Sequence, residues 1–169
     1  MIQVLQNDGK GNFTTNDSIV LNRRDIASAA FGDVNNDGKV DVVILNIDGP
    51  PTLLLNRTRS ANHAVLAHLI GTKSNKAAIG ARVTVTAGDL VQFNEVRGGG
   101  SYLSSNDLRL HFGLGAHSQI DKVEIAWPSG EKDTFTSLPT DFIYTFVEGN
   151  PTPQKVPFAV DYSSPALQR

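Results

Sequence analysis

Short apolar runs separated by turn-forming residues recur along the chain, and this pattern restricts the possible folds more than any other feature. Glycine, asparagine, aspartate and proline lie between the runs, as in NDGKGN, NNDG, DGPP and PSGE. Apolar residues at helical spacing are hard to find. We therefore expect an all-β protein with strands over 2–6, 18–22, 26–32, 40–46, 52–56, 64–70, 80–87, 90–96, 108–113, 121–127, 132–136 and 142–147.

A change in composition near 57–63 divides the 169 residues, a length that suits one domain or somewhat more. We expect a first segment over 1–60 and an antiparallel β-sandwich over 61–149, in which ARVTVTAG and DKVEIAW alternate apolar and polar residues and so give each strand one buried face. Residues 150–169 are rich in proline and serine and predict an extended tail on the surface, or a linker.

Charge and composition exclude several classes of partner. The net charge is −2 and no run of 18 apolar residues exists, so we expect no nucleic-acid partner and no membrane insertion. The absence of cysteine excludes disulfides and cysteine nucleophiles. No apolar signal segment precedes the first strand, and the start of the chain is typical of a cut within a longer protein.

The stretch DVNNDGKVD, residues 33–41, places acids and amides on alternate positions directly before a β-branched run. In an extended loop around an ion, Asp33, Asn35 and Asp37 converge, Lys39 offers its backbone carbonyl, and Asp41 completes the set. Carboxylates this close repel one another by about 4 kcal/mol per pair at about 4 Å and an effective dielectric constant near 20. A cation removes that repulsion.

Hard oxygen ligands without histidine or cysteine suit Ca²⁺ rather than Zn²⁺. An EF-hand requires a glutamate at the twelfth position and an exiting helix, whereas this chain has Ile44 inside a run that favours a strand. The pattern therefore predicts a calcium loop between two β-strands. The alternative is a hairpin turn with solvated acids, since Asn-Asp-Gly alone forms good turns.

The stretch AAFGDVNNDGKVDVVILN resembles the FG-GAP/VCBS repeat, the calcium-loop unit of β-propellers, and LQNDGKGNFTT at 5–15 is similar to the end of a preceding repeat. The resemblance covers residues 1–58 and implies that Asp33, Asn35, Asp37, the Lys39 carbonyl and Asp41 are metal ligands. A propeller needs about four to eight blades and this chain holds about one and a half. We expect further blades upstream, or strand edges that pair with the C-terminal domain or with another chain.

Residues 63–148 resemble the ASPIC/UnbV domain, found in cartilage acidic protein-like and bacterial proteins, through AIGARVTVTAGDLVQFNEVRGGGSYLSSNDLRLHFGLG and IDKVEIAWPSGEKDTF. The fold class expected is thus all-β, an incomplete FG-GAP propeller-blade segment plus an antiparallel β-sandwich. The resemblance implies architecture rather than a reaction. The three glycines at 98–100 predict a bulge or wide turn, because no Gly-Lys-Ser/Thr and no helix follow them.

No catalytic arrangement emerges from the sequence, and we expect a protein that is not an enzyme. Glu95, Asp121 and Glu124 would pair only if a shared cleft brought them together, and the four histidines lack metal-ligand spacing. Solved coordinates that placed paired carboxylates in one cleft would favour the rival hypothesis, a hydrolase. A third hypothesis is a structural spacer without a binding surface.

Binding is the function that the residues favour. Arg97, Tyr102, Asn106 and Trp127 are types that stack on sugars or anchor protein contacts, although Tyr102 and Trp127 also suit core or edge packing. We expect a calcium-binding extracellular, periplasmic or cell-surface adhesion module. Its ligand would be a protein or polysaccharide, with self-association through exposed sheet edges also possible. The alternative is a carbohydrate-binding accessory domain of a polysaccharide-degrading enzyme.

Overall fold

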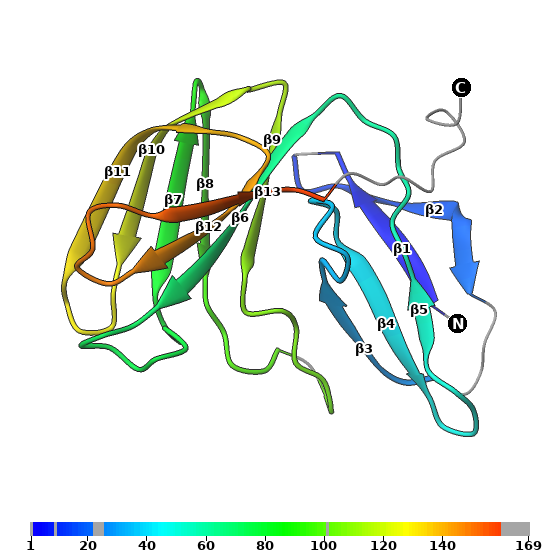
Figure 1. Cartoon of the computed structure of the whole chain (residues 1–169). Helices are drawn as coiled ribbons and strands as arrows, with labels where there is room; N and C mark the ends of the chain where they lie inside the picture. The colour runs from blue at the N-terminus through cyan, green and yellow to red at the C-terminus, as the bar shows by residue number, and fades with distance from the viewer. Residues whose placement is uncertain (1, 9, 22–25, 101, 160–169) are drawn as a thin grey trace.

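The computed structural model describes residues 2–8, 10–21, 26–100 and 102–159, and within them it contains four β-sheets and no helix (Figure 1). The predicted all-β class is confirmed. The strands are β1 (Ile2–Asn7), β2 (Phe13–Leu21), β3 (Ile26–Gly32), β4 (Asp41–Asn46), β5 (Thr52–Leu54), β6 (His63–Ile70), β7 (Arg82–Ala87), β8 (Leu90–Glu95), β9 (Leu110–Gly115), β10 (Gln119–Ala126), β11 (Lys132–Pro139), β12 (Phe142–Val147) and β13 (Gln154–Pro157).

The C-terminal part is a sandwich of two four-stranded sheets, ordered β11-β10-β7-β8 and β13-β12-β6-β9. All neighbouring strands in it are antiparallel except β6 and β12, which pair in parallel with Val65 opposite Phe142 and Ile70 opposite Val147. Alternation along β7 and β10 sets the register, because the inward residues Val85 and Val123 are direct partners.

The core lies between these two sheets. It is built from aliphatic side chains and a group of aromatic ones, of which Phe112, Tyr144 and Phe146 are each 1% exposed. Phe135 and Phe146 have ring centroids 4.8 Å apart in a tilted arrangement, a geometry that aromatic pairs favour. The Tyr144 hydroxyl donates to the carbonyl oxygen of Pro139 at 2.8 Å, which satisfies its polar end inside the core.

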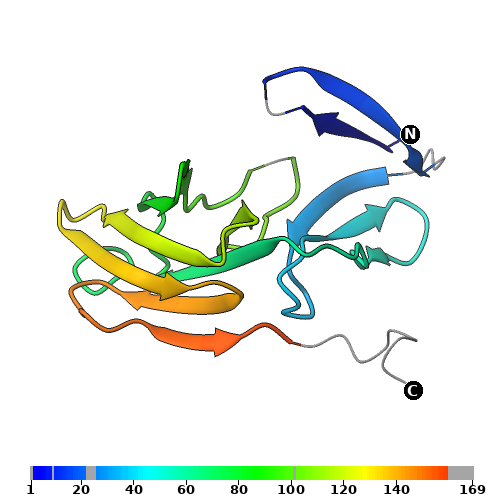
Figure 2. The same ribbon diagram turned by 90° about the horizontal axis from the view of Figure 1, so that it is seen from above.

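The N-terminal part consists of the β1-β2 hairpin and a separate antiparallel sheet, β3-β4-β5 (Figure 2). Only Ile44 among the apolar residues of this sheet is fully buried, whereas Phe31, Leu45 and Leu53 are about half exposed. The outer edge of β3 is covered by the connection between β8 and β9: Phe31 donates to the Asn106 side chain, and its carbonyl accepts from the Asp107 amide. This connection therefore blunts one free strand edge.

Two strands differ from the sequence-based expectation. β2 begins at Phe13 rather than near residue 18, because the stretch FTTN pairs with β1. Residues 154–157, expected in a tail, form β13 and extend the sheet beside β12. The proposed end of the second strand at residue 22, and the part of the tail from 160 onward, lie outside the described residues.

Candidate functional site

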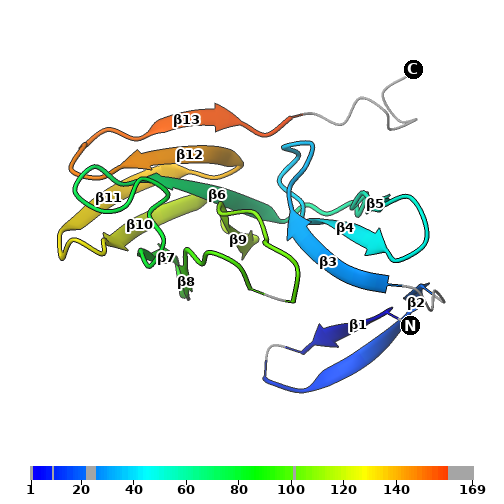
Figure 3. The ribbon, with the colours of Figure 1, turned by 90° about the horizontal axis from the view of Figure 1, so that it is seen from below.

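The acidic loop connects β3 to β4 and reaches toward the sandwich (Figure 3). Asp33 follows the last residue of β3 and is 3% exposed, and Asp41 is the first residue of β4 and is 1% exposed. The side chain of Asp37 is 5% exposed. The alternative interpretation, a hairpin turn with solvated acids, does not fit these three carboxylates: they are withdrawn from solvent, where an uncompensated negative charge is costly.

Backbone amides of the loop hold two of these carboxylates. Asp33 accepts from the amides of Asp37 at 3.1 Å and Gly38 at 2.9 Å, one on each oxygen. Asp41 accepts from Val34 at 3.0 Å and from Asn56 at 2.8 Å. The loop is thus closed on itself and tied to the segment after β5.

The remaining members of the predicted set lie at the tip of the loop. Asp37 accepts from the Lys39 amide at 2.9 Å, and the Lys39 ammonium lies 3.5 Å from its other oxygen. The amide nitrogen of Asn35 donates to Asp37 at 3.1 Å. Asn36 and Gly38 have φ angles of 61° and 82°, so the chain reverses sharply here, as the glycine predicted.

The donor set suits a hard cation, but the side chains do not converge on one point. Within the described residues, no group of three or more histidine, cysteine, aspartate or glutamate side chains is arranged around a common metal position. Each carboxylate oxygen that accepts one N–H group keeps a further lone pair. Asp33, Asn35, Asp37 and Asp41 would hold a calcium ion through these lone pairs with the Lys39 carbonyl, and the ion would supply positive charge to the buried acids.

Electrostatics in the loop favour such a cation. Burial raises the pKa of Asp33 above its usual value, and the nearby Asp37 charge raises it further, against the lowering effect of the amide hydrogen bonds and Arg109. Among the described residues, neither Asp33 nor Asp41 forms an ion pair with a lysine or arginine side chain. Backbone amides are thus the direct hydrogen-bond partners of these two carboxylates within the described residues.

The sandwich holds this loop through hydrogen bonds from β9 and from the residue before it. Arg109 donates to the Asp33 carbonyl oxygen and to the Asn36 side chain, both at 2.6 Å, and its Nε atom donates to Asp107 at 2.7 Å. The Nε2 atom of His111 lies 2.8 Å from the carbonyl oxygen of Gly38. Each of the three guanidinium nitrogens donates a hydrogen bond, which fixes the loop against the sandwich.

The residues after β13 also contact the acidic loop. The Ala159 amide donates to the Asn36 carbonyl at 2.6 Å, and the Phe158 amide donates to the Asp141 carbonyl at 3.1 Å. The Phe158 ring lies so close to Gly38 that an added Cβ there would meet it at 2.4 Å. Gly38 is therefore required twice, for its φ angle and for the space that Phe158 occupies.

A pocket of about 290 Å³ opens beside the loop, between the N-terminal sheet and the sandwich. Two buried leucines, Leu66 and Leu110, form the apolar part of its floor, where the buried Asp33 also lies, and Phe31 lines the pocket beside them. The rim carries Arg97, Asn94 and Asn106. The structure thus brings together two of the four predicted binding residues, Arg97 and Asn106.

The other two predicted binding residues lie elsewhere. Trp127 is 4% exposed, belongs to the core, and donates from Nε1 to Asp133 at 2.7 Å, so core packing accounts for it. Tyr102 is 79% exposed and does not line the pocket.

The three acids considered as catalytic have separate structural partners. Glu95 pairs with Arg82 at 3.0 Å, Asp121 accepts from the Gly88 amide at 2.7 Å, and Glu124 pairs with Lys122 at 3.0 Å. Among the histidines, His63 contacts Asp141 at 2.7 Å and His117 contacts Asp89 at 3.2 Å.

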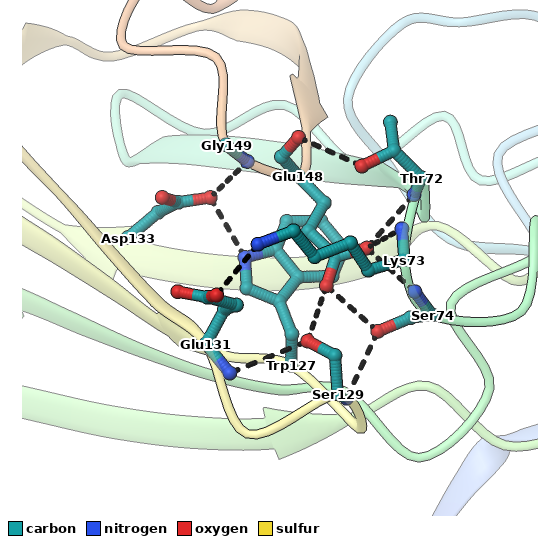
Figure 4. Close-up of polar contacts among 9 residues, drawn as sticks. All are labelled: Thr72, Lys73, Ser74, Trp127, Ser129, Glu131, Asp133, Glu148 and Gly149. Carbon is teal, nitrogen blue, oxygen red and sulfur yellow. Dashed lines mark hydrogen bonds and ion pairs between the residues drawn. The ribbon is translucent and has the colours of Figure 1, made fainter.

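The sequence analysis missed Glu148, which closes one end of the sandwich (Figure 4). The Oε2 atom accepts from three successive backbone amides, those of Thr72, Lys73 and Ser74, at 2.7–2.8 Å. The Oε1 atom accepts from the hydroxyl groups of Ser74 and Ser129. The Thr72 hydroxyl donates to the Glu148 carbonyl at 3.2 Å. One carboxylate thereby joins the end of β12 to two loops.

The environment of Glu148 stabilises its charge. Burial alone would raise its pKa, but the hydrogen bonds from Ser129, Ser74 and Thr72 outweigh burial and lower the pKa to about 2. Three consecutive amides around one oxygen form an anion-binding concavity filled by the protein's own side chain. A single glutamate after a strand carries no sequence signal for this role, although the PSGE stretch that contains Ser129 was predicted as a turn.

The fold and the loop define an all-β protein made of a repeat segment with an acidic β-loop, followed by a sandwich domain. Residues 71–153 match the family model described as ASPIC and UnbV, and residues 1–44 match the FG-GAP-like repeat. The order of these two matches, repeat first and ASPIC/UnbV domain second, confirms the predicted architecture. No curated protein matches the chain. Among the described residues, no helix is long and apolar enough to cross a membrane.

Proposed function

We propose that this chain is a non-enzymatic, calcium-stabilised binding module that acts outside the cell, at the cell surface or in the periplasm. One observation carries the calcium assignment: Asp33 and Asp41 are 3% and 1% exposed without an ion pair among the described residues. The FG-GAP-like and ASPIC/UnbV matches support the class of module and its location, since such domains are typical of extracellular or periplasmic proteins. Bound Ca²⁺ has a structural role: it neutralises the acids of the loop and stabilises the conformation in which the loop binds the sandwich.

Melting curves with and without a chelator test the calcium site. With Ca²⁺ at about 100 times its dissociation constant, the ion stabilises the fold by about 2.7 kcal/mol, which raises the melting temperature by several degrees. Asp37→Ala removes most of this response, whereas Asp48→Ala, at an exposed acid in the β4-β5 turn, keeps it. Identical curves for the wild-type protein in Ca²⁺ and in chelator would contradict the site.

A second candidate function is the carbohydrate-binding accessory domain of a polysaccharide-degrading enzyme. The pocket of about 290 Å³ favours it, because ligand pockets prefer domain junctions and combine an apolar floor with a few polar groups. A glycan array probed with the wild-type chain tests it. Protein ligands without any glycan signal would favour adhesion instead.

A further inference from the structure

The pocket beside the acidic loop has unused hydrogen-bond donors, and this imbalance indicates what it binds. Its acids already have donors within the protein: Glu95 accepts from Arg82 at 3.0 Å, and Asp107 from Arg109 at 2.7 Å. Asp33 accepts from the loop amides. Each of these acids thus has at least one donor within the protein before any ligand arrives.

The donors on the rim are not occupied. Arg97 is exposed and has no hydrogen bond or ion pair within the described residues. The side-chain oxygens of Asn94 and Asn106 accept from the Glu95 and Phe31 amides. The NH₂ groups of these two side chains therefore remain to donate to a ligand. A guanidinium and two amide NH₂ groups on one rim favour a ligand rich in acceptors and negatively charged.

The size and floor of the pocket restrict the ligand further. The volume of about 290 Å³ lies at the small end of the usual range of ligand pockets, so it suits a single ring rather than a chain of rings. Leu66 and Leu110 provide an apolar floor, and Phe31, half exposed on the wall, gains from being covered. An apolar ring face with a carboxylate at one edge matches this distribution.

We propose that the pocket binds one uronic acid residue of an acidic polysaccharide, with its carboxylate on Arg97, its hydroxyl groups near Asn94 and Asn106, and one ring face toward Phe31. The assignment deepens the proposed binding function and rests on it. Gly99 and Gly100 line the same rim, and an added Cβ at Gly100 would meet the Asn106 amide nitrogen at 3.5 Å. The absence of side chains there keeps the entrance open.

NMR titration of the full chain with galacturonate and with galactose tests the proposal, because the two sugars differ only at the carboxylate. We expect galacturonate to bind at least tenfold more tightly and to shift amide signals near Arg97 and Asn106. Arg97→Gln lowers the affinity at least tenfold, whereas Arg57→Gln, at an exposed arginine between β5 and β6, leaves it unchanged. Gly100→Leu fills the entrance and abolishes binding.

Equal affinity for the two sugars, or unchanged galacturonate affinity in Arg97→Gln, would overturn the proposal. A capped tripeptide with a free terminal carboxylate serves as the second probe, and tighter binding of this peptide than of galacturonate would also overturn it. Melting curves of the same samples in Ca²⁺ and in chelator separate the two hypotheses. If the chain responds to Ca²⁺ but binds neither sugar, the calcium-stabilised module is supported and the uronate site is contradicted.

Discussion

The Nε2 atom of His111 lies 2.8 Å from the carbonyl oxygen of Gly38, which joins a strand of the sandwich to the tip of the acidic loop. The other hydrogen bonds between the β3-β5 sheet and the sandwich also fall on residues 31–38 within the described chain. The position of the N-terminal sheet thus depends on the conformation of one loop. Any ion that fixes this loop also fixes the walls of the adjacent pocket.

Gly38→Ala is expected to destabilise the protein through two separate effects. The φ angle of 82° costs about 1–3 kcal/mol for a residue other than glycine. The new methyl group also meets the Phe158 ring. Gly130→Ala is the matched control, because its φ angle is 91° and nothing lies within 4 Å of an added Cβ. Chemical denaturation measures both, and equal losses of unfolding free energy would show that Phe158 moves aside freely.

Arg109→Lys is expected to loosen the grip on the acidic loop, because an ammonium cannot bind Asp107, Asn36 and the Asp33 carbonyl at the same time. Hydrogen bonds to a charged group contribute about 1.5–3 kcal/mol each, and we expect a loss of about 2 kcal/mol in unfolding free energy. Arg57→Lys is the control for the same exchange at an exposed site. Protection of the 31–38 amides in hydrogen exchange should fall in Arg109→Lys alone.

Glu148 is expected to make the sandwich sensitive to acid. Its folded pKa of about 2 lies below the usual value of 4.5, so the stabilisation is complete above about pH 4.5 and is lost as the pH falls toward 2. Glu148→Gln introduces an NH₂ group against the Thr72, Lys73 and Ser74 amides and the Ser129 hydroxyl. We expect a less stable variant whose melting temperature depends less on pH between 4.5 and 2. Asp48→Asn, at an exposed acid of the β4-β5 turn, should keep the wild-type slope.

Tyr144 is expected to make the sandwich sensitive to alkali. Burial raises its pKa from 10 to about 12, so its contribution is complete below pH 10 and is lost as the pH rises toward 12. Tyr144→Phe loses the hydrogen bond to Pro139, at a cost of about 1 kcal/mol near neutral pH. The variant should also lose stability less steeply between pH 10 and 12. A wild-type slope in the variant would assign the alkaline transition to other groups.

Periodicity predicted most of the sandwich because most of its strands bury one face. β7 and β10 alternate as the sequence predicted, and the two sheets enclose those inward residues. β13 was missed because all four of its residues are exposed, so no burial pattern marks Gln154–Pro157 as a strand. Its pairing with β12 depends on backbone hydrogen bonds, which leave no trace in side-chain chemistry.

The sequence predicted the acidic residues of the candidate site but not the residues of the sandwich that contact them. Alternate spacing located Asp33, Asp37 and Asp41 on one loop, and the burial of all three accords with a site for a cation. Arg109 and His111 could not be assigned to that loop, because about 70 residues separate them from it and only the register of β9 brings them there. Calcium itself remains a prediction.

The parallel pairing of β6 with β12 has a consequence for synthesis on the ribosome. Val65 cannot pair with Phe142 until nearly the whole domain has left the exit tunnel. Until then, the apolar faces of the first sandwich strands stay exposed to solvent. A nascent chain arrested before residue 142 should accordingly bind chaperones, and one released after residue 147 should not.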